Sequence, residues 1–439
     1  MTAHRTKPIL KLGSIALAFV VVLATLALAN RSSNPPSDPP GRQGADLGAP
    51  PRNTEEQVKS LQRQIRADPS DARGYAALGD AYLQRTRETG DFAFYTRAER
   101  SFREAFRRDP DSAQAIVGEA TLALARHDFR EGLRQGERAL ALEPETVRPY
   151  AAIVDGQVEL GRYRGAARSL QEMVDRRPNL ASYSRISYFR ELNGDVPGAI
   201  EAMRLAVSAG GGTSENVAFV QTLLGDLQLD AGRVSRARRA YGEALTSEPA
   251  HLPARAGLAR IDVARGNLES AARRLRQVSE RLPLPIYLTP LAEIEIVRGN
   301  RAQANRDLEL VRAQRRLLEA AGTRTDVDLA LFEADHGDPR RAVRFARAVF
   351  ASAPSVRSSD ALGWALTRAG NPREGLRHAR QALRLGSVDP SFHYHAGMAA
   401  KALGQRGTAA RELRRTLSLN PSFSPLHARR ARRSLADLP

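Results

Sequence analysis

The clearest pattern in the chain is a repeated pair of amphipathic segments. Between residues 218 and 249, apolar positions recur every three or four residues through two segments that are separated by Gly232 and closed by Pro249. Such spacing is typical of one buried stripe along an α-helix, and glycine and proline are typical of helix ends. The stretch therefore predicts two helices folded back on each other, which need neighbours of the same kind to bury their stripes.

Prolines mark the period of this pattern. Pro110, Pro144 and Pro178 are 34 residues apart, and Pro249 and Pro283 have the same separation. A fixed period of this length indicates an all-α solenoid in which each helix pair covers the next, and we count about ten pairs. The predicted organisation is a solenoid over residues 72–421, with a capping helix at 54–71 before it and another at 422–439 after it.

The first full unit carries the residues that indicate a family. In chain order they are Tyr75, Leu78, Gly79, Tyr82, Ala98, Phe102, Ala105 and Pro110. Their spacing resembles the tetratricopeptide pattern W-x2-L-G-x2-Y, A-x3-F, P, with Tyr in place of Trp and about seven extra residues near Thr86 to Tyr95 that we expect to lengthen the turn. The resemblance implies a right-handed superhelix of antiparallel helix pairs. A solenoid carries its function on a surface instead of in a catalytic pocket, so we expect it to bind a partner.

The C-terminal part also resembles a narrower group. The segments FEADHGD at 332–338, HYHAGM at 393–398 and NPSFSPLHA at 420–428 resemble uncharacterised bacterial exported or membrane-tethered proteins of the tetratricopeptide family. That resemblance implies no known activity.

The N-terminus differs from the rest of the chain. Basic residues at 5, 7 and 11 precede an uncharged apolar run at 12–29, which predicts entry into a membrane, with residues 1–29 as an anchor or signal peptide. We favour a retained single-pass anchor with the following chain outside the cytoplasm, but Ala27-Leu28-Ala29 resembles a cleavage site, and cleavage would make the protein secreted. Residues 30–53 are rich in Pro and Gly and predict a disordered tether.

The charge of the chain is strongly basic. The formal net charge is +18, and nearly all of the positive charge is Arg spread evenly through the repeats. Such a balance is compatible with nucleic acid, an anionic membrane or an acidic partner, but also with arginines on solvated helix faces. The even spread disfavours nucleic acid, whose binders carry clustered basic residues. The absence of Cys excludes disulfides, thiol catalysis and cysteine metal ligands.

The only candidate metal-binding set lies near the C-terminus. It consists of Asp335, His336, Asp360, His393 and His395. Mixed His and Asp ligation suits zinc, but His393 and His395 are two residues apart on a predicted helix and point about 200° away from each other. We therefore expect these residues to hydrogen-bond between units, and His336 to satisfy carbonyls at a helix end. We predict no cofactor, no metal and no enzymatic activity, with a metal-dependent or enzymatic C-terminal module as an alternative.

The candidate binding surface is the concave groove, which the family resemblance places on positions 2, 5, 9 and 12 of the first helices. The candidate groove residues are Asp80, Asp155, Tyr188, Phe219, Thr222, Asp226, Leu229, Arg260, Glu293, Trp364 and Tyr394. A Trp such as Trp364 is more often a core residue than a ligand anchor, and Tyr394 is similarly ambiguous. Acids outnumber bases at position 9, so we hypothesise a neutral to acidic groove that accepts a polar or cationic peptide.

The arginine excess should then lie on the second helices and the outer face, as Arg97, Arg100 and Arg103 indicate in the first unit. The function we predict is a protein–protein interaction scaffold at the cell envelope. A second alternative is an anionic polymer or nucleic-acid binder that uses the Arg-rich outer face.

Overall fold

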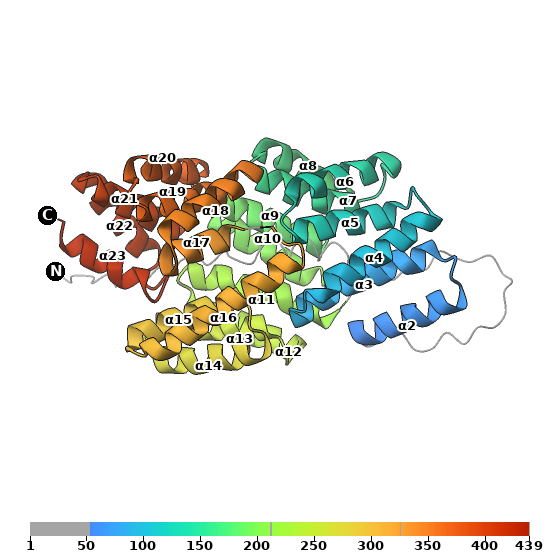
Figure 1. Cartoon of the computed structure of the whole chain (residues 1–439), viewed down its shortest axis with the longest axis horizontal. Helices are drawn as coiled ribbons and strands as arrows, with labels where there is room; N and C mark the ends of the chain where they lie inside the picture. The colour runs from blue at the N-terminus through green and yellow to red at the C-terminus, as the bar shows by residue number, and fades with distance from the viewer. Residues whose placement is uncertain (1–52, 211–212, 325, 439) are drawn as a thin grey trace, which may run out of the picture.

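The protein is built of paired helices. The computed structural model describes residues 53–210, 213–324 and 326–438, which contain α-helices and one short 3-10 helix but no strand (Figure 1). Each of ten units consists of a first helix and a second helix that contact each other. The first helices are α3 (Ala72–Thr89), α5 (Ala113–Ala125), α7 (Arg148–Glu159), α9 (Leu180–Leu192), α11 (Ser214–Asp230), α13 (Leu252–Ala264), α15 (Pro285–Arg298), α17 (Val327–His336), α19 (Val356–Arg368) and α21 (Pro390–Ala402).

The second helices lie antiparallel to the first. They are α4 (Ala93–Arg108), α6 (Phe129–Leu142), α8 (Tyr163–Arg176), α10 (Val196–Ser208), α12 (Val234–Ser247), α14 (Leu268–Arg281), α16 (Arg301–Ala320), α18 (Pro339–Ser352), α20 (Pro372–Ala382) and α22 (Arg406–Leu419). Helix α2 (Thr54–Ala67) precedes the ten units, α23 (His427–Ala436) follows them, and the 3-10 helix η2 (Leu383–Leu385) extends α20. The array is therefore an all-α solenoid of the tetratricopeptide kind.

The local sequence explains where the helices begin and end. Short polar side chains accept hydrogen bonds from free N–H groups at many helix starts, as Asp71 does from Gly74 at 2.8 Å and Asn179 from Ser182 at 3.0 Å. Pro110, Pro144 and Pro178, which set the predicted period, each lie just after a second helix. Proline cannot continue a helix, so these residues separate one unit from the next.

The turn of the first unit differs from its prediction. We expected the extra residues near Thr86 to Tyr95 to lengthen the turn, but they extend the first helix, because α3 has 18 residues and ends at Thr89. Gly90 ends it in the left-handed conformation with φ of 66°, and α4 begins three residues later. The additional helical turn brings Arg87 across the molecule to α11.

A single aromatic ring fills the space between successive units. In unit five, the ring of Tyr241 lies between Gly225 of its own unit and Gly257 of the next unit. A Cβ atom at either glycine would come within 3 Å of that ring. Phe102 occupies the same place between Gly79 and Gly118 in units one and two. The small residue of the Leu-Gly pair therefore accommodates a ring from the second helix, which explains why the family pattern pairs glycine with an aromatic position.

The solenoid turns back on itself. The turns within units one to four contact the connections that precede units seven to ten. Gly90 lies against Leu282, the Arg126 carbonyl accepts from the Arg324 amide at 3.0 Å, and the Gly194 turn lies against the Gly386 carbonyl. Tyr163 accepts a 2.7 Å hydrogen bond from the Val356 amide 193 residues later, and Arg324 pairs with Asp128 at a separation of 196 residues.

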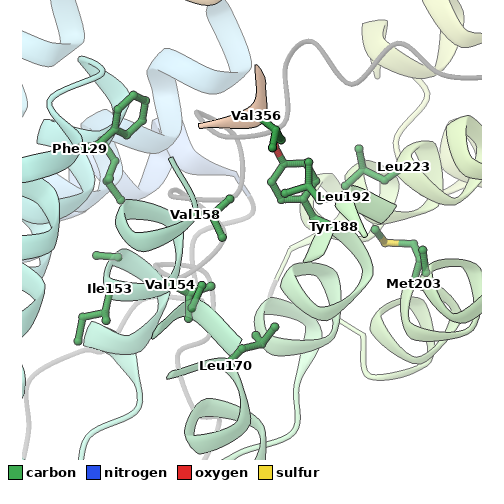
Figure 2. Packing of buried hydrophobic residues seen from close by; sticks show 14 of the residues in the cluster. Phe129, Ile153, Val154, Val158, Leu170, Tyr188, Leu192, Met203, Leu223 and Val356 are labelled. Atoms are coloured by element: carbon green, nitrogen blue, oxygen red, sulfur yellow. The ribbon is translucent and has the colours of Figure 1, made fainter. Parts of the chain in front are cut away.

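We call these the one-turn contacts, because they bring together chain segments that are about one superhelical turn apart. A buried apolar cluster accompanies them (Figure 2). Val356 of α19 belongs to the same cluster as Tyr188 and Leu192 of α9. Burial of apolar surface therefore holds the two superhelical turns together, in addition to the hydrogen bonds.

The predicted membrane segment at 12–29 and most of the predicted tether lie outside the described residues. Among the described residues, no helix combines the length and the apolar character needed to cross a membrane.

Candidate functional site

A cavity of about 780 Å³ lies against the first helices of units five to seven. Its walls come from α11, α13 and α15, from the start of α2 and the end of α3, and from the α22–α23 connection. Segments from both ends and from the middle of the chain therefore meet around one space, because the array turns back on itself. Cavities of this size with mostly apolar walls are the usual form of ligand sites in proteins.

The floor of the cavity is apolar. It includes residues of three first helices and of the connection between α14 and α15, namely Phe219, Leu223, Leu227, Val263, Leu282, Leu284, Ile286, Tyr287 and Ile294. Six carboxylates, three guanidinium groups and one imidazole also line the cavity. Most of these polar groups pair with one another, as Glu88 does with Thr54 and Arg85, and Glu248 with Ser214.

One end of the cavity is acidic. Arg260 of α13 forks between Asp226 and Asp230 of α11, at 2.5 and 2.7 Å, and Tyr241 donates to Asp226 at 2.7 Å. Burial raises the pKa of the Asp226 carboxyl despite the neighbouring Arg260. The two carboxylates lie one helical turn apart, so a single guanidinium group reaches both.

Glu191, at the end of α9, lies at the same end. Its carboxyl makes no hydrogen bond with another described residue, although it lines the cavity. Burial, followed by the charges of Asp230, Asp389 and Asp226, raises the pKa of Glu191 to about 8. This carboxyl is therefore mostly neutral at pH 7 and ionises near pH 8.

The opposite end of the cavity carries hydrogen-bonding groups without partners. The Arg87 side chain is 7% exposed, and its Nη2 contacts Glu215 and Asn216, while its Nε and Nη1 have no partner within the described residues. Nε2 of His251 likewise has no partner, and that residue is 5% exposed. Burial lowers the pKa of His251 to about 3, with a further contribution from Arg87, so the ring is neutral.

Unpartnered buried groups of this kind are rare in folded proteins and are normally satisfied by water or by a ligand. The Arg87 end is therefore prepared to donate hydrogen bonds to a molecule in the cavity.

The structure brings five of the eleven predicted groove residues to this cavity. They are Phe219, Thr222, Asp226, Leu229 and Arg260. The first four form the stripe on α11, and Arg260 joins them from α13. Whether a partner occupies the cavity stays a prediction.

Three predicted groove carboxylates lie elsewhere and are engaged inside the protein. Asp155 forms a buried bidentate pair with Arg185, at 2.9 and 2.7 Å. Asp80 accepts from Gln114 and Arg148, both at 3.2 Å. Glu293 accepts from Ser424 at 3.1 Å. Each partner belongs to a different unit or to the C-terminal connection, so these acids link separate parts of the chain.

The remaining three predicted groove residues are core residues. Tyr188 belongs to the cluster in Figure 2. Trp364, which is 2% exposed, stacks on His395 at 4.5 Å and donates to Asp335 at 3.1 Å. Tyr394 is fully buried and stacks on His427 at 4.8 Å. Of the two interpretations that the sequence left open for Trp364 and Tyr394, the structure therefore supports the core.

The C-terminal histidines pair singly with carboxylates. Nδ1 of His395 lies 2.9 Å from Asp360 of another unit, and Nδ1 of His393 lies 2.8 Å from Glu412. Nε2 of His336 lies 3.3 Å from Glu293, where we had expected it to satisfy helix-end carbonyls. No group of three or more His, Cys, Asp or Glu side chains in the described part of the chain could hold a metal ion.

Sequence reasoning missed the residues that lie across the cavity from α11. Arg87 had a signal, because the insertion after Tyr82 places it beyond the usual end of a first helix. Glu191 and His251 had none, because they lie at the end of α9 and just before α13, outside the groove positions that the family resemblance provides.

Comparison with known proteins identifies the class. Residues 152–213 and residues 228–294 each match a family model described as tetratricopeptide repeat. Together with the helix pairs and their aromatic–glycine packing, these matches show that the chain is a tetratricopeptide repeat protein. Arrays of this family are scaffolds for protein–protein interaction.

Similar proteins share parts of the array. Cellulose synthase 1 operon protein C of Komagataeibacter xylinus is 24% identical over 199 residues, which are 45% of this chain and 13% of that protein. This chain therefore spans only a small part of that relative. Among solved structures, the APC/C hetero-tetramer Cut9-Hcn1 matches at 13% identity and a TM-score of 0.38, over 87% of this chain and 93% of that one. A thermophilic TPR protein of Thermus thermophilus matches at 20% identity and a TM-score of 0.35, over 40% and 95%.

Proposed function

We propose that the protein is a non-enzymatic scaffold that binds a short extended segment of a protein partner in the cavity against α11, α13 and α15. The observation that carries this proposal is the stripe of Phe219, Thr222, Asp226 and Leu229, which lines an apolar cavity with polar groups at both ends. The apolar floor can bury side chains of the segment, and the polar ends can fix its direction. The groove residues that lie outside the cavity are already paired or buried, so they support no second binding site.

Selection of binding peptides tests this proposal. A displayed library of random peptides is selected against the full chain and against Ala256→Phe, in which a large side chain fills the cavity from α13. The control is Ala302→Phe, on the exposed first turn of α16. Enrichment of a common motif by the wild type and Ala302→Phe, but not by Ala256→Phe, is expected. Equal enrichment by all three proteins would place binding outside the cavity.

We also propose that the scaffold acts at the cell envelope, with residues 1–29 as the membrane segment. The support is the apolar run at 12–29 behind basic residues. Extraction of membranes with alkaline carbonate should leave the protein in the pellet, whereas deletion of residues 1–29 should release it. Recovery of the intact chain in the soluble fraction would contradict the anchor.

A second candidate function rests on the C-terminal end. Residues 406–438 carry eight arginines against two carboxylates, and most of those arginines are exposed on α22 and α23. Such a surface attracts anionic polymers. Retention on heparin that falls steeply with salt, and that is lost when Arg414, Arg415, Arg429 and Arg433 become Gln, would support it. Unchanged retention of that variant would exclude the C-terminal end as the cause.

A further inference from the structure

The two ends of the cavity differ in charge, although the floor between them is apolar. At one end, Glu191 of α9 lines the cavity together with Asp226 and Asp230 of α11 and Arg260 of α13. The charges of these three groups and of Asp389, which precedes α21, all act on Glu191. Tyr241 and Tyr287 are the other titratable groups beside Asp226. With Glu191 ionised, this end lacks positive charge, and Arg260 is already shared between two carboxylates.

The other end of the cavity has hydrogen-bonding groups without partners but no excess charge. The buried Arg87 keeps two unpartnered nitrogens, Nε and Nη1, and the neutral His251 keeps one unpartnered ring nitrogen. Glu215 already balances the charge of Arg87, so a carboxylate placed there would face a negative neighbour. A main-chain carbonyl and amide of a peptide match these groups better, because they exchange hydrogen bonds and carry no charge.

The two ends are separated by a distance that suits a short peptide. Glu215 and Asp226 lie eleven residues apart on α11, which corresponds to about 16 Å along the helix axis. An extended chain covers about 3.3 Å per residue, so about five residues connect the two ends.

We infer that the cavity binds its peptide with a basic side chain, arginine or lysine, placed against Glu191, Asp226 and Asp230, and with main-chain groups of the peptide bonded to Arg87 and His251. This inference rests on the proposed function and adds the chemistry of the segment that is recognised. The basic side chain gives Glu191 the hydrogen-bonding partner that it lacks. Charged hydrogen bonds in a cavity are stronger than neutral ones, so the basic residue selects the partner.

The inference also implies a dependence on pH. A cation in the cavity favours the charged form of Glu191, so binding is strongest where that carboxyl is ionised, above its pKa of about 8. Asp389, whose pKa burial raises to about 6, is already mostly ionised at pH 7. The affinity for a basic peptide should therefore rise between pH 6.5 and pH 9, while that for a neutral peptide should stay constant.

Two fluorescent pentapeptides test the inference on the full chain. Both have the sequence Leu-Ala-Leu-Ala-Xaa with blocked termini, and Xaa is arginine in one and citrulline in the other. Citrulline has nearly the same shape as arginine but no charge. Fluorescence polarisation at pH 9 should give a Kd for the arginine peptide at least about tenfold lower, and the ratio should shrink at pH 6.5.

Variants of the protein assign the effect to one carboxyl. Glu191→Gln should reduce the preference for arginine to about threefold or less and remove its pH dependence, because a charged hydrogen-bond acceptor is lost. Glu243→Gln on the exposed face of α12 is the matched control and should change nothing. Equal affinities of the two peptides for the wild type, or a full arginine preference in Glu191→Gln, would overturn the inference.

The same measurements separate this inference from the proposed function. If both peptides bind equally and Ala256→Phe abolishes both, the cavity binds peptides without a basic residue, so only the inference fails. If neither peptide binds at any concentration tested, and the peptide selection also yields no cavity-dependent motif, both fail.

Discussion

Glycine in this protein makes room for aromatic rings. Gly225 follows Leu224 on the first helix of unit five, and the absence of a side chain at Gly225 leaves space beside that helix. The structure shows that the ring of Tyr241 occupies the space, and that Gly257 of the next unit forms its other wall. The second wall could not be predicted, because Gly257 is not part of a Leu-Gly pair and only the packed array shows what it contacts.

Alanine should destabilise the fold at Gly257, which faces a ring, but not at Gly242, which faces none. Gly257→Ala places a methyl group within 3 Å of the Tyr241 ring and should destabilise the fold by about 1–3 kcal/mol. Gly242→Ala, on the exposed face of α12 with nothing within 4 Å, should instead stabilise it by about 0.5–1 kcal/mol. Thermal unfolding of both variants checks this, and a loss of stability in both would contradict the ring-packing explanation.

The buried pair of His395 and Asp360 should make stability depend on pH. Burial lowers the pKa of His395, but the charge and hydrogen bond of Asp360 outweigh burial and raise it above 6.5. The folded protein therefore holds this proton more tightly than the unfolded chain, and the resulting stability is complete below pH 6.5 and is lost as pH rises through the raised pKa.

Melting temperatures between pH 6 and pH 9 measure this contribution. The wild type should lose stability over that range more steeply than His395→Gln, which cannot bind the proton. Parallel curves for the two proteins would show that His395 is neutral in the fold.

Helix α3 shows how far element prediction from sequence extends. Its existence and its start follow from the apolar spacing and from Asp71, and the insertion after Tyr82 was visible. The prediction that the insertion lengthens a turn was wrong, because its residues continue the helix as far as Thr89. The extra helical turn is stabilised by a contact with α11, more than 120 residues away. No local sequence pattern predicts such a contact.

Arg87, near the end of α3, should contribute more to the stability of the fold than an ordinary surface arginine does. Arg87→Ala leaves Glu215, itself only 16% exposed, without its cation and should cost about 3 kcal/mol. Arg107→Ala on α4 removes an ion pair whose arginine is 69% exposed, so its effect should stay within about 0.5 kcal/mol. Urea unfolding compares the two variants, and similar small losses would show that the α3–α11 contact contributes little.

The return of the array onto itself is the feature of the molecule that the sequence could not predict. The sequence of each unit predicts its own helices and its contact with the next unit. The register of the one-turn contacts depends instead on small rotations summed over about six units. For the same reason, the residues that line the cavity could be predicted only in part. Its α11 stripe was predicted from one repeat, whereas the place of Arg87, which reaches α11 from unit one, follows only from the folded array.

Alanine substitutions at two glycines with the same backbone conformation distinguish the effect of the one-turn contacts from that of local backbone strain. Gly194 and Gly266 end first-helix turns with φ of 78° and 80°, and alanine at either should cost about 1–2 kcal/mol for the left-handed conformation. A Cβ atom at Gly194 would also collide with the Gly386 carbonyl of the next superhelical turn, whereas nothing lies within 4 Å of Gly266. Gly194→Ala should therefore be the less stable variant, and small-angle X-ray scattering should show a larger radius of gyration for it alone. Equal radii for the two variants would contradict the one-turn contacts.

The position of a bound peptide tests the proposed binding mode most directly. The arginine pentapeptide is made with benzoylphenylalanine at its central position and irradiated with the full chain, and mass spectrometry identifies the residue to which it attaches. We expect attachment to residues that line the cavity on α11, α13 or α15, with none in Ala256→Phe. Attachment to the outer helices α12 or α14, unaffected by Ala256→Phe, would contradict it.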